Sequence, residues 1–283
     1  MIRQAVILCG GLDTRLGALT AQTPKPLLPV GENPFLDVLL FELGRHGLRQ
    51  ILLLAGFAAD RVREYVIATP LKTQFGLEIE VMSEPQRAGT GGALWHARDR
   101  LDEVFLLLNG GSWFDINLLE LAARTVRDPS ATAGIALTSL CDPSLCNVVE
   151  IDREKITKFH SHADHQGSCL GNGGVYVCRR ALVDRLVHVP RSRRTHFRAS
   201  LVTESWSGYR STDISSTSGF LNLWHLLGRI CHGGDGGPPP FSTATGSSIM
   251  TMDMSGRASV SAGSMAASQR SNRSTMPVFL SLS

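Results

Sequence analysis

The chain has 283 residues, of which 43% are hydrophobic and 19% charged, and its formal net charge at pH 7 is +3. This length and apolar content suffice for one sizeable core and a small second domain. The small net charge, without a basic stripe interleaved with aromatic residues, argues against nucleic-acid binding. The N-terminus has no signal-peptide pattern and no apolar run is long enough to span a bilayer, so we expect a cytoplasmic protein without a membrane partner.

The most informative segment covers residues 6–31 and reads VILCGGLDTRLGALTAQTPKPLLPVG. An apolar run that ends at Gly10 and Gly11 predicts a buried strand whose carboxyl end opens into a ligand crevice. The two glycines let backbone amides approach phosphate oxygens closely. Arg15 offers a bidentate guanidinium group, and Lys25, between two prolines, adds a point charge. This order of features indicates a loop that wraps the phosphates of a nucleotide.

Strand-like and helix-like patterns alternate through the first two-thirds of the chain. Helical spacing is found over residues 35–47, which end on glycine, and over 60–67. Further apolar strands are expected at residues 50–55, 77–82, 104–108 and 133–138. Such βαβ organisation predicts an α/β protein with a mostly parallel sheet covered on both faces.

Cysteines and histidines give no clear metal signal. The six cysteines lack CxxC or Cys/His ligand spacing, so we expect free thiols rather than disulfides or a zinc site. They are Cys9, Cys141, Cys146, Cys169, Cys178 and Cys231. A metal site at His160, His162 and His165 is a minor alternative, because these residues are expected in a polar loop.

Four motifs in order resemble the sugar-phosphate nucleotidyltransferases. The first segment resembles the family signature GGxGTRL…PKPxxP, and SEPQRAGTGGALWHA (83–97) resembles its E-x-x-x-x-G-T-G-G-A loop. LLLNGGSWFDIN (106–117) resembles the L-x-N-G-D segment, and NVVEID, KITKFH and NGGVYV (172–177) resemble the part that grips the sugar phosphate. The resemblance implies a three-layer α/β/α, Rossmann-like (GT-A-type) nucleotide-binding fold.

The resemblance also implies a reaction and its residues. A sugar 1-phosphate oxygen would attack the α-phosphorus of a nucleoside triphosphate and release pyrophosphate, so cations and positioning would carry catalysis. Arg15 and Lys25 would be catalytic, and Asn172 and Gly173 would bind the sugar phosphate. The residues expected to bind the nucleotide are Gly10, Gly11, Thr14, Arg15, Glu84, Gly89 and Thr90. Magnesium would be the expected cofactor.

The chain departs from the family pattern at the positions nearest to this chemistry. Asp13 replaces a glycine of GGxGTRL, which brings a negative charge into a loop that should pack against a polyanion. Gly111 replaces the aspartate of NGD, which leaves a divalent ion without a hard ligand. Asp115 is a weak substitute candidate. The lysine of the family's F-x-E-K motif is also absent, because Ser161 and His162 follow Phe159-His160.

The sequence changes character beyond about residue 189. The remainder is rich in Ser, Gly, Thr, Met and Arg, with a Gly-Gly-Pro-Pro-Pro break at residues 236–240. We predict a nucleotidyltransferase domain over 1–189, with its C-terminal part missing or altered, and a disordered low-complexity tail over 190–283.

A second interpretation of the tail uses the genetic code. Read from the third base of each codon, residues 212–221 are compatible with a family-like G-Y-x-x-D-x-G-x-P segment. Residues 242–254 are then compatible with a D-x-D-G motif resembling haloacid dehalogenase-like phosphatases. We hypothesise that a frameshift near residues 186–192 converted a transferase–phosphatase fusion into this chain, which would make the in-frame Asp213 a decoy.

Such a fusion narrows the expected substrates. A nucleotidyltransferase paired with a heptose bisphosphate phosphatase resembles the route to an activated heptose, used for lipopolysaccharide or other cell-surface polysaccharides. Guanylyl transfer from GTP to heptose 1-phosphate is therefore the leading specificity, and thymidylyl, uridylyl or cytidylyl transfer to a hexose 1-phosphate remains open. The alternative is a catalytically inactive nucleotide-binding remnant.

Overall fold

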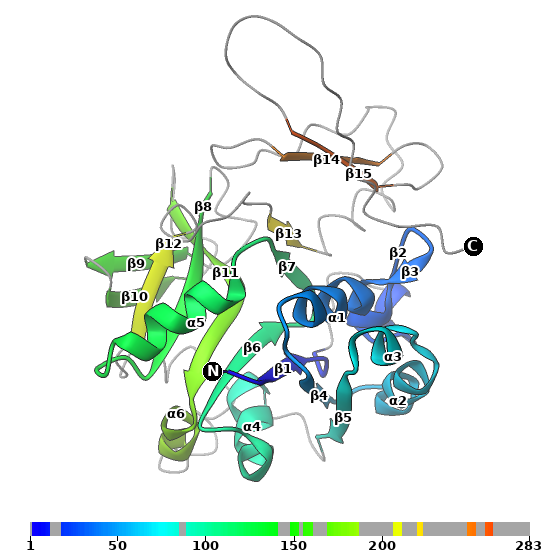
Figure 1. Ribbon diagram of the computed structural model, residues 1–283, viewed down its shortest axis with the longest axis horizontal. Helices are drawn as coiled ribbons and strands as arrows, with labels where there is room; N and C mark the ends of the chain where they lie inside the picture. The colour runs from blue at the N-terminus through cyan, green and yellow to red at the C-terminus, as the bar shows by residue number, and fades with distance from the viewer. Residues whose placement is uncertain are drawn as a thin grey trace, which may run out of the picture.

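The computed structural model describes residues 2–11, 18–84, 89–140, 148–152, 155–160 and 169–186, and the backbones of residues 206–210, 220–222, 248–252 and 258–262. Within these residues a central sheet of nine strands has the order β5-β4-β1-β6-β11-β8-β12-β10-β9 (Figure 1). The expected α/β class with a mostly parallel central sheet is confirmed.

One half of the sheet is wholly parallel, and we call it the nucleotide half. It consists of β5 (Glu78–Ser83), β4 (Gln50–Ala55), β1 (Gln4–Leu8) and β6 (Val104–Asn109). Strand β1 pairs in parallel register with β4 on one side and with β6 on the other. Both β1 and β4 are buried along almost their whole length, which explains why their sequences are continuous apolar runs rather than alternating ones.

The other half, which we call the acceptor half, is mixed. Strand β11 (Cys169–Arg179) runs antiparallel between β6 and β8 (Ala133–Leu140). Strands β9 (Val148–Asp152) and β10 (Lys155–His160) form an antiparallel pair at the far edge. Short connections between these strands suit antiparallel pairing, because a parallel return needs a long crossover.

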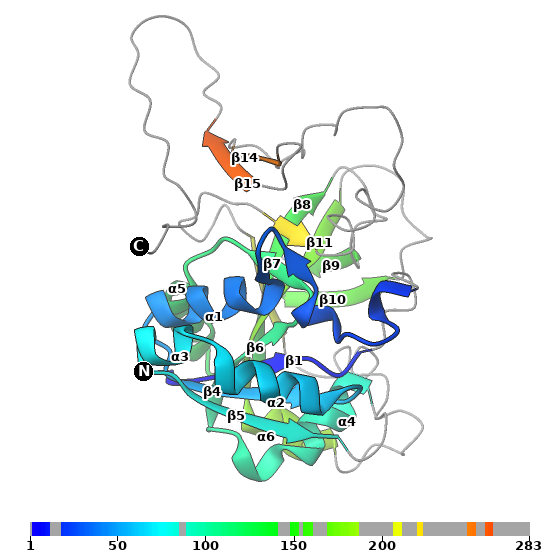
Figure 2. The ribbon, with the colours of Figure 1, turned by 90° about the vertical axis from the view of Figure 1, so that its right-hand side faces the viewer.

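Helices cover both faces of the sheet. One face packs against α1 (Phe35–Arg45), α2 (Ala59–Ala68), α3 (Leu71–Phe75) and α5 (Leu118–Arg127). The opposite face packs against α4 (Gly89–His96) and α6 (Arg180–Arg185) (Figure 2). Along β1, Ala5 and Ile7 belong to the first core and Val6 to the second, as the alternation of a strand requires. The expected three-layer α/β/α arrangement follows.

Short elements complete the described chain. A 3₁₀ turn η2 (Lys25–Leu27) precedes the small hairpin of β2 (Pro29–Val30) and β3 (Asn33–Pro34). A second 3₁₀ turn, η3 (Arg98–Arg100), follows α4, and β7 (Ser112–Phe114) follows β6.

Four backbone segments lie beyond the predicted boundary at residue 189. Strand β12 (Trp206–Arg210) joins the central sheet in parallel with β8, and β13 (Phe220–Asn222) pairs with β7. Strands β14 (Ser248–Met252) and β15 (Ala258–Ala262) pair with each other. The predicted division at residue 189 stays a prediction. No helix in the described part of the chain is long and apolar enough to cross a membrane.

Candidate functional site

The carboxyl ends of the nucleotide-half strands are tied together by backbone hydrogen bonds. The amide of Cys9, just after β1, donates to Leu54 O at 2.8 Å. The amide of Glu84, just after β5, donates to Ala55 O at 2.8 Å. On the other side, the Gly110 amide donates to Leu8 O at 3.1 Å. Ligands of open parallel sheets bind at this edge, so these hydrogen bonds build the rim of a candidate nucleotide site.

Gly10 lies at a crowded point of that rim. A Cβ at this position would lie 2.7 Å from Glu84 Oε1 and 2.9 Å from the backbone N of Gly56. Only glycine fits such a close approach of loop to loop. The predicted nucleotide residues Gly10 and Glu84 are therefore neighbours in space. Gly56 was not predicted, although a glycine directly after an apolar strand is the same signal that singled out Gly10.

The thiol next to this rim does not supply a nucleophile. Cys9 is 2% exposed, and its burial, with a smaller contribution from the charge of Glu84, raises the pKa of the thiol to about 12. Cys178 is also buried, and its pKa is raised for the same reason of burial. Both are free cysteines, as expected from the sequence.

Lys25 and Gly111 lie against each other, although 86 positions in the printed sequence separate them. A Cβ at residue 111 would overlap the aliphatic end of the Lys25 side chain and would lie 2.8 Å from Lys25 Nζ. At the preceding residue, a Cβ on Gly110 would overlap Leu8 O and lie 2.8 Å from Pro26 Cγ. The predicted phosphate-loop lysine thus lies at the carboxyl end of β6, where the sequence lacks the expected carboxylate.

The described residues do not fit a divalent metal ion at this place. Gly111 offers no ligand, and Asp115 is 3.6 Å from Arg45 Nη2 in an ion pair. Among the described ranges, no group of three or more His, Cys, Asp or Glu side chains could hold a metal. A hard divalent cation needs several oxygen ligands, so this constellation does not supply a magnesium site.

His160 has a different setting from the one expected. It ends strand β10 rather than lying in a polar loop, because β9 and β10 form a hairpin ladder through this residue. Its Nε2 lies 2.6 Å from Glu150 Oε1 across the hairpin. His162 and His165 lie outside the described residues.

Gly89 and Thr90 begin a helix and not the loop that the sequence indicated. Helix α4 spans Gly89–His96, with Gly89 at a φ of +64°. Gly91 and Gly92 are buried in it together with Ala93, so small side chains let this helix pack close to the sheet. Thr90 is half-buried at the first turn of this helix.

Asn172 lies at an irregularity of strand β11. The β11–β8 register shifts between residues 172 and 176. Within that bulge Asn172 Nδ2 donates to the Tyr176 hydroxyl at 2.8 Å, and the Gly174 amide donates to Asn172 Oδ1 at 2.8 Å. A Cβ on Gly173 would overlap the ring of Phe114. Asn172 therefore fixes the bulge that brings β11 against β7.

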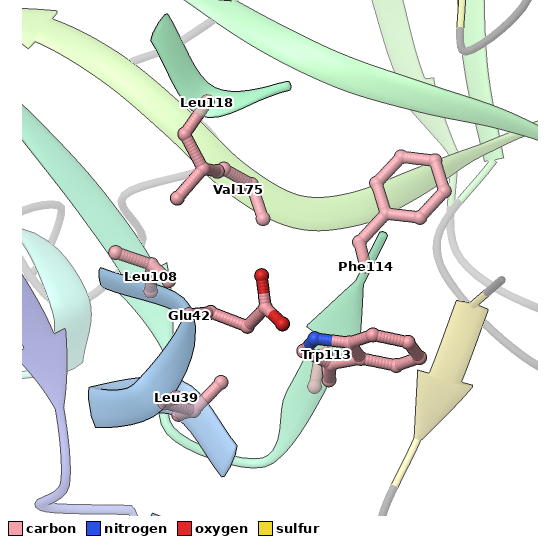
Figure 3. A pocket seen from close by; sticks show the side chains of 8 residues that line it. Leu39, Glu42, Leu108, Trp113, Phe114, Leu118 and Val175 are labelled. Carbon is pink, nitrogen blue, oxygen red and sulfur yellow. The ribbon is translucent and has the colours of Figure 1, made fainter. Parts of the chain in front are cut away.

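A small buried cavity lies between α1, β7 and β11. It measures about 10 Å³, and its lining includes Glu42, Trp113 and Val175 (Figure 3). The Glu42 carboxylate points toward the Trp113 indole, whose buried Nε1 has no hydrogen-bond acceptor among the described residues. Such a volume holds about one water molecule and no sugar phosphate. Neither Glu42 nor Trp113 belongs to a sequence motif, and a lone Glu in an amphipathic helix gives no signal of a site.

A larger hollow of about 540 Å³ lies at the opposite edge of the sheet, lined by Gln4, Gln50, Lys72 and Arg100 among others. Gln4 there is fully engaged, since its Nε2 donates to Arg100 O at 2.7 Å and its Oε1 accepts from the Asp102 amide at 2.8 Å. This hollow lies at the amino ends of β1 and β4. The site built from the sequence motifs is at the other edge, and Asp13, Thr14 and Arg15 lie outside the described residues.

Comparison with known proteins decides the family. Residues 4–213 match the family described as nucleotidyl transferase. The chain belongs to the nucleotidyl transferase family. The sugar-phosphate nucleotidyltransferases are thus the right relatives, as the four motifs indicated, and this family generally uses a divalent metal ion.

Similar curated members of this family include two heptose enzymes. A D-glycero-alpha-D-manno-heptose 1-phosphate guanylyltransferase of Campylobacter jejuni is 29% identical over 175 residues, covering 62% of this chain and 75% of that protein. One from Aneurinibacillus thermoaerophilus is 27% identical over 182 residues, covering 64% and 76%.

A solved crystal structure has a similar fold. HddC from Yersinia pseudotuberculosis, complexed with GMP-PN, superposes with a TM-score of 0.66 at 20% identity, covering 79% of this chain and 94% of that one. This likeness supports the fold. The family match and the curated relatives, not this likeness, show that the chain is a sugar-phosphate nucleotidyltransferase by family.

Proposed function

We propose that this nucleotidyl transferase moves GMP from GTP to heptose 1-phosphate. In the reaction a phosphate oxygen of the sugar phosphate attacks the α-phosphorus of GTP. A new O–P bond forms, the bond from the α-phosphorus to the bridging oxygen breaks, and pyrophosphate leaves. Charge accumulates on phosphate oxygens, so the Lys25 ammonium and the Arg15 guanidinium would hold the triphosphate.

The observation that carries the choice of base is the Glu84 carboxylate beside Gly10. Its Oε1 lies 2.7 Å from the Cβ position of Gly10, at the end of the parallel strands. A carboxylate accepts hydrogen bonds through two oxygens and donates none when ionised. Guanine presents two adjacent donors, N1–H and N2–H, whereas uracil and thymine present one N–H between two carbonyl acceptors. A carboxylate at the base therefore favours guanine and repels the carbonyls.

The choice of sugar is supported by the relatives and by the acceptor half. Two of the similar proteins are named as heptose 1-phosphate guanylyltransferases. Asn172 and Gly173 lie in the β11 bulge that faces β7, next to the turn at Gly111. These residues would border the sugar phosphate. A cytoplasmic location would suit soluble nucleotide and sugar-phosphate substrates.

Pyrophosphate release tests the proposal. The full chain is supplied with heptose 1-phosphate and, in turn, GTP, UTP, CTP or dTTP, with and without magnesium. We expect GTP to give the highest rate. Glu84→Gln should lower the preference for GTP over UTP by about tenfold, because the amide replaces one acceptor by a donor. Equal rates with all four nucleotides, or an unchanged preference in Glu84→Gln, would contradict guanine selection by Glu84.

A catalytically inactive nucleotide-binding protein is the second candidate, and the absence of a carboxylate at Gly111 favours it. Nucleotide binding without pyrophosphate release from any sugar 1-phosphate would support this alternative. Restoring the family pattern with Asp13→Gly and Gly111→Asp would then still leave activity low, because the second metal-binding aspartate, which the family carries in its G-Y-x-x-D-x-G-x-P segment, would remain missing.

We further propose that residues 190–283 include out-of-frame sequence. The family match runs to residue 213 and strand β12 lies past residue 189, so features read in frame overlap the proposed shift, and the gene sequence has to decide between them. Sequencing the source gene across codons 13, 111 and 185–196 provides it. A missing or extra base that opens a longer frame would mean that the true product is a longer bifunctional enzyme, and an unchanged sequence would mean that this chain is a decayed transferase core with a meaningless tail.

A further inference from the structure

We infer that the Lys25 ammonium takes the place of a divalent cation at the end of β6, so that a triphosphate binds at this site without a metal ion. The inference rests on the proposed nucleotide binding. It starts from the turn Asn109-Gly110-Gly111, in which the family pattern has a carboxylate at the last position and this chain has none.

The space at Gly111 is filled by Lys25. The position of a Cβ on residue 111 coincides with the end of the lysine side chain, whose Cδ and Nζ each lie 2.8 Å from it. A larger residue at 111 would have to displace that side chain. The lysine can occupy this place only because residue 111 has no side chain, so the glycine and the position of Lys25 depend on each other.

The backbone of Lys25 is fixed so that its side chain reaches this point. Pro24 and Pro26 flank it and are both buried. The 3₁₀ turn is closed by hydrogen bonds from the Leu27 amide to Pro24 O at 2.8 Å and from the Leu28 amide to Lys25 O at 3.1 Å. Pro26 also packs against Gly110, where a Cβ would lie 2.8 Å from its Cγ. Prolines limit the turn to one backbone conformation, so the lysine returns to the same place.

The chemistry of the two cations decides what this arrangement binds. A divalent ion requires several hard oxygen ligands, which the described residues do not gather here. An ammonium group next to the same point repels a second cation but attracts phosphate oxygens. The Lys25 ammonium therefore places one fixed positive charge beside Gly111, at the strand end where the phosphates would lie.

Calorimetric titration of GTP tests the inference on the full chain, in EDTA and in magnesium. We expect the wild-type affinity to differ by less than about threefold between the two conditions. Lys25→Met should lower the affinity in EDTA by about tenfold or more, whereas Lys25→Arg, which keeps the charge, should retain most of it. Lys72→Met is the matched control, because Lys72 lies in the hollow at the opposite sheet edge.

Gly111→Asp gives a second, opposite measurement. The new carboxylate should weaken GTP binding in EDTA, because it competes for Lys25, and magnesium should restore it. Binding of Mn²⁺ in the presence of GTP, followed by electron paramagnetic resonance, should be tighter in Gly111→Asp than in the wild type, because the new carboxylate adds one hard oxygen ligand to those of the phosphates. A loss of wild-type affinity above about tenfold in EDTA, no GTP binding in either condition, or equal affinities of wild type and Lys25→Met would each overturn the inference.

The outcomes separate this inference from the proposed function. Metal-independent GTP binding without pyrophosphate release would leave the inference standing and contradict the transferase proposal. Pyrophosphate release that requires magnesium, with GTP binding lost in EDTA, would support the transferase proposal and contradict the metal-independent binding inferred here. Circular dichroism of each variant confirms that a change in affinity does not reflect unfolding.

Discussion

The nucleotide half and the acceptor half of the central sheet present different residues at their ligand edge. In the nucleotide half, parallel strands end in glycines that backbone contacts require, as at Gly10 against Gly56 and at Gly110 against Leu8. In the acceptor half, antiparallel β11 carries a bulge fixed by side-chain hydrogen bonds of Asn172. The first edge is built from backbone, and the second from side chains.

This difference explains why the fold can accommodate the departure from the family pattern at Gly111. At Gly10 and Gly110 a side chain would force the strand ends apart, because a Cβ there would overlap neighbouring atoms. Gly111 stands where the two halves meet, and there the space that a side chain would occupy is filled by the flexible end of Lys25 rather than by backbone. The fold therefore tolerates the absence of a carboxylate at position 111 and has no room for a side chain at Gly10 or Gly110.

The strongest test of the backbone-built edge is Gly110→Ala. The added Cβ would overlap Leu8 O and crowd Pro26. We expect the free energy of unfolding to fall by about 3 kcal/mol, because the colliding atom belongs to a buried backbone that cannot move aside. Urea denaturation measures it. Gly11→Ala is the control, since nothing lies within 4 Å of its Cβ position, and a change of no more than about 1 kcal/mol is expected. Equal losses of unfolding free energy in Gly110→Ala and Gly11→Ala would contradict the view that backbone contacts require glycine at position 110.

Asn172→Ala tests the side-chain-built edge. It removes the hydrogen bonds to the Tyr176 hydroxyl and from the Gly174 amide. We expect a loss of about 2 kcal/mol in thermal or urea unfolding, because two partly buried groups lose their partner. Tyr176→Phe removes only one of these bonds and should cost about half as much. If Tyr176→Phe is as destabilising as Asn172→Ala, the bond to Gly174 contributes nothing to the bulge.

Asn117→Ala examines the helix that covers the acceptor half. Asn117 caps α5, and its Oδ1 accepts from the amides of Leu119 and Glu120, both at 3.1 Å. Loss of this cap should lower the free energy of unfolding by about 1 kcal/mol. Asn117→Ser is the matched variant, since serine also caps helices, and it should lose only a few tenths of that amount. A serine variant as unstable as the alanine variant would show that the cap is not the cause.

The smallest expected effect is on the pH dependence of stability, through Glu42 at the boundary between the halves. Burial raises the pKa of this carboxyl above its ordinary value of 4.5, although Arg45, at 2.6 Å, opposes the shift. The folded state then holds the proton more tightly than the unfolded state. Stability from this group is therefore present at low pH and is lost as pH rises from 4.5 through the higher folded value.

Glu42→Gln should remove that pH dependence, with a difference below about 1 kcal/mol. Thermal unfolding between pH 4 and pH 7 (about the range in which a raised glutamate titrates) measures it. Exposed Glu64→Gln serves as the control and should leave the slope unchanged. A steeper loss of stability with rising pH in Glu42→Gln than in the wild type would contradict a raised pKa of Glu42 in the folded state.

Much of the nucleotide half could be predicted from its sequence. The expected strand at 50–55 and helix from residue 35 agree with β4 and α1, because both have strong apolar patterns of the right period. The acceptor half was less predictable. The direction of β11 and its bulge at Asn172 depend on long-range pairing, and helix α4 was taken for a loop because its glycines are poor helix formers in isolation.

The sequence by itself determined the family, the α/β class and the positions of the phosphate-loop glycines and Lys25, because local spacing and apolar periodicity encode them. The tertiary structure decided which of these residues meet. Gly10 lies beside Glu84, and Lys25 fills the place of a side chain at Gly111, only because parallel strands distant in sequence end at the same edge of one sheet. Distances across a sheet depend on strand order, which no local pattern contains.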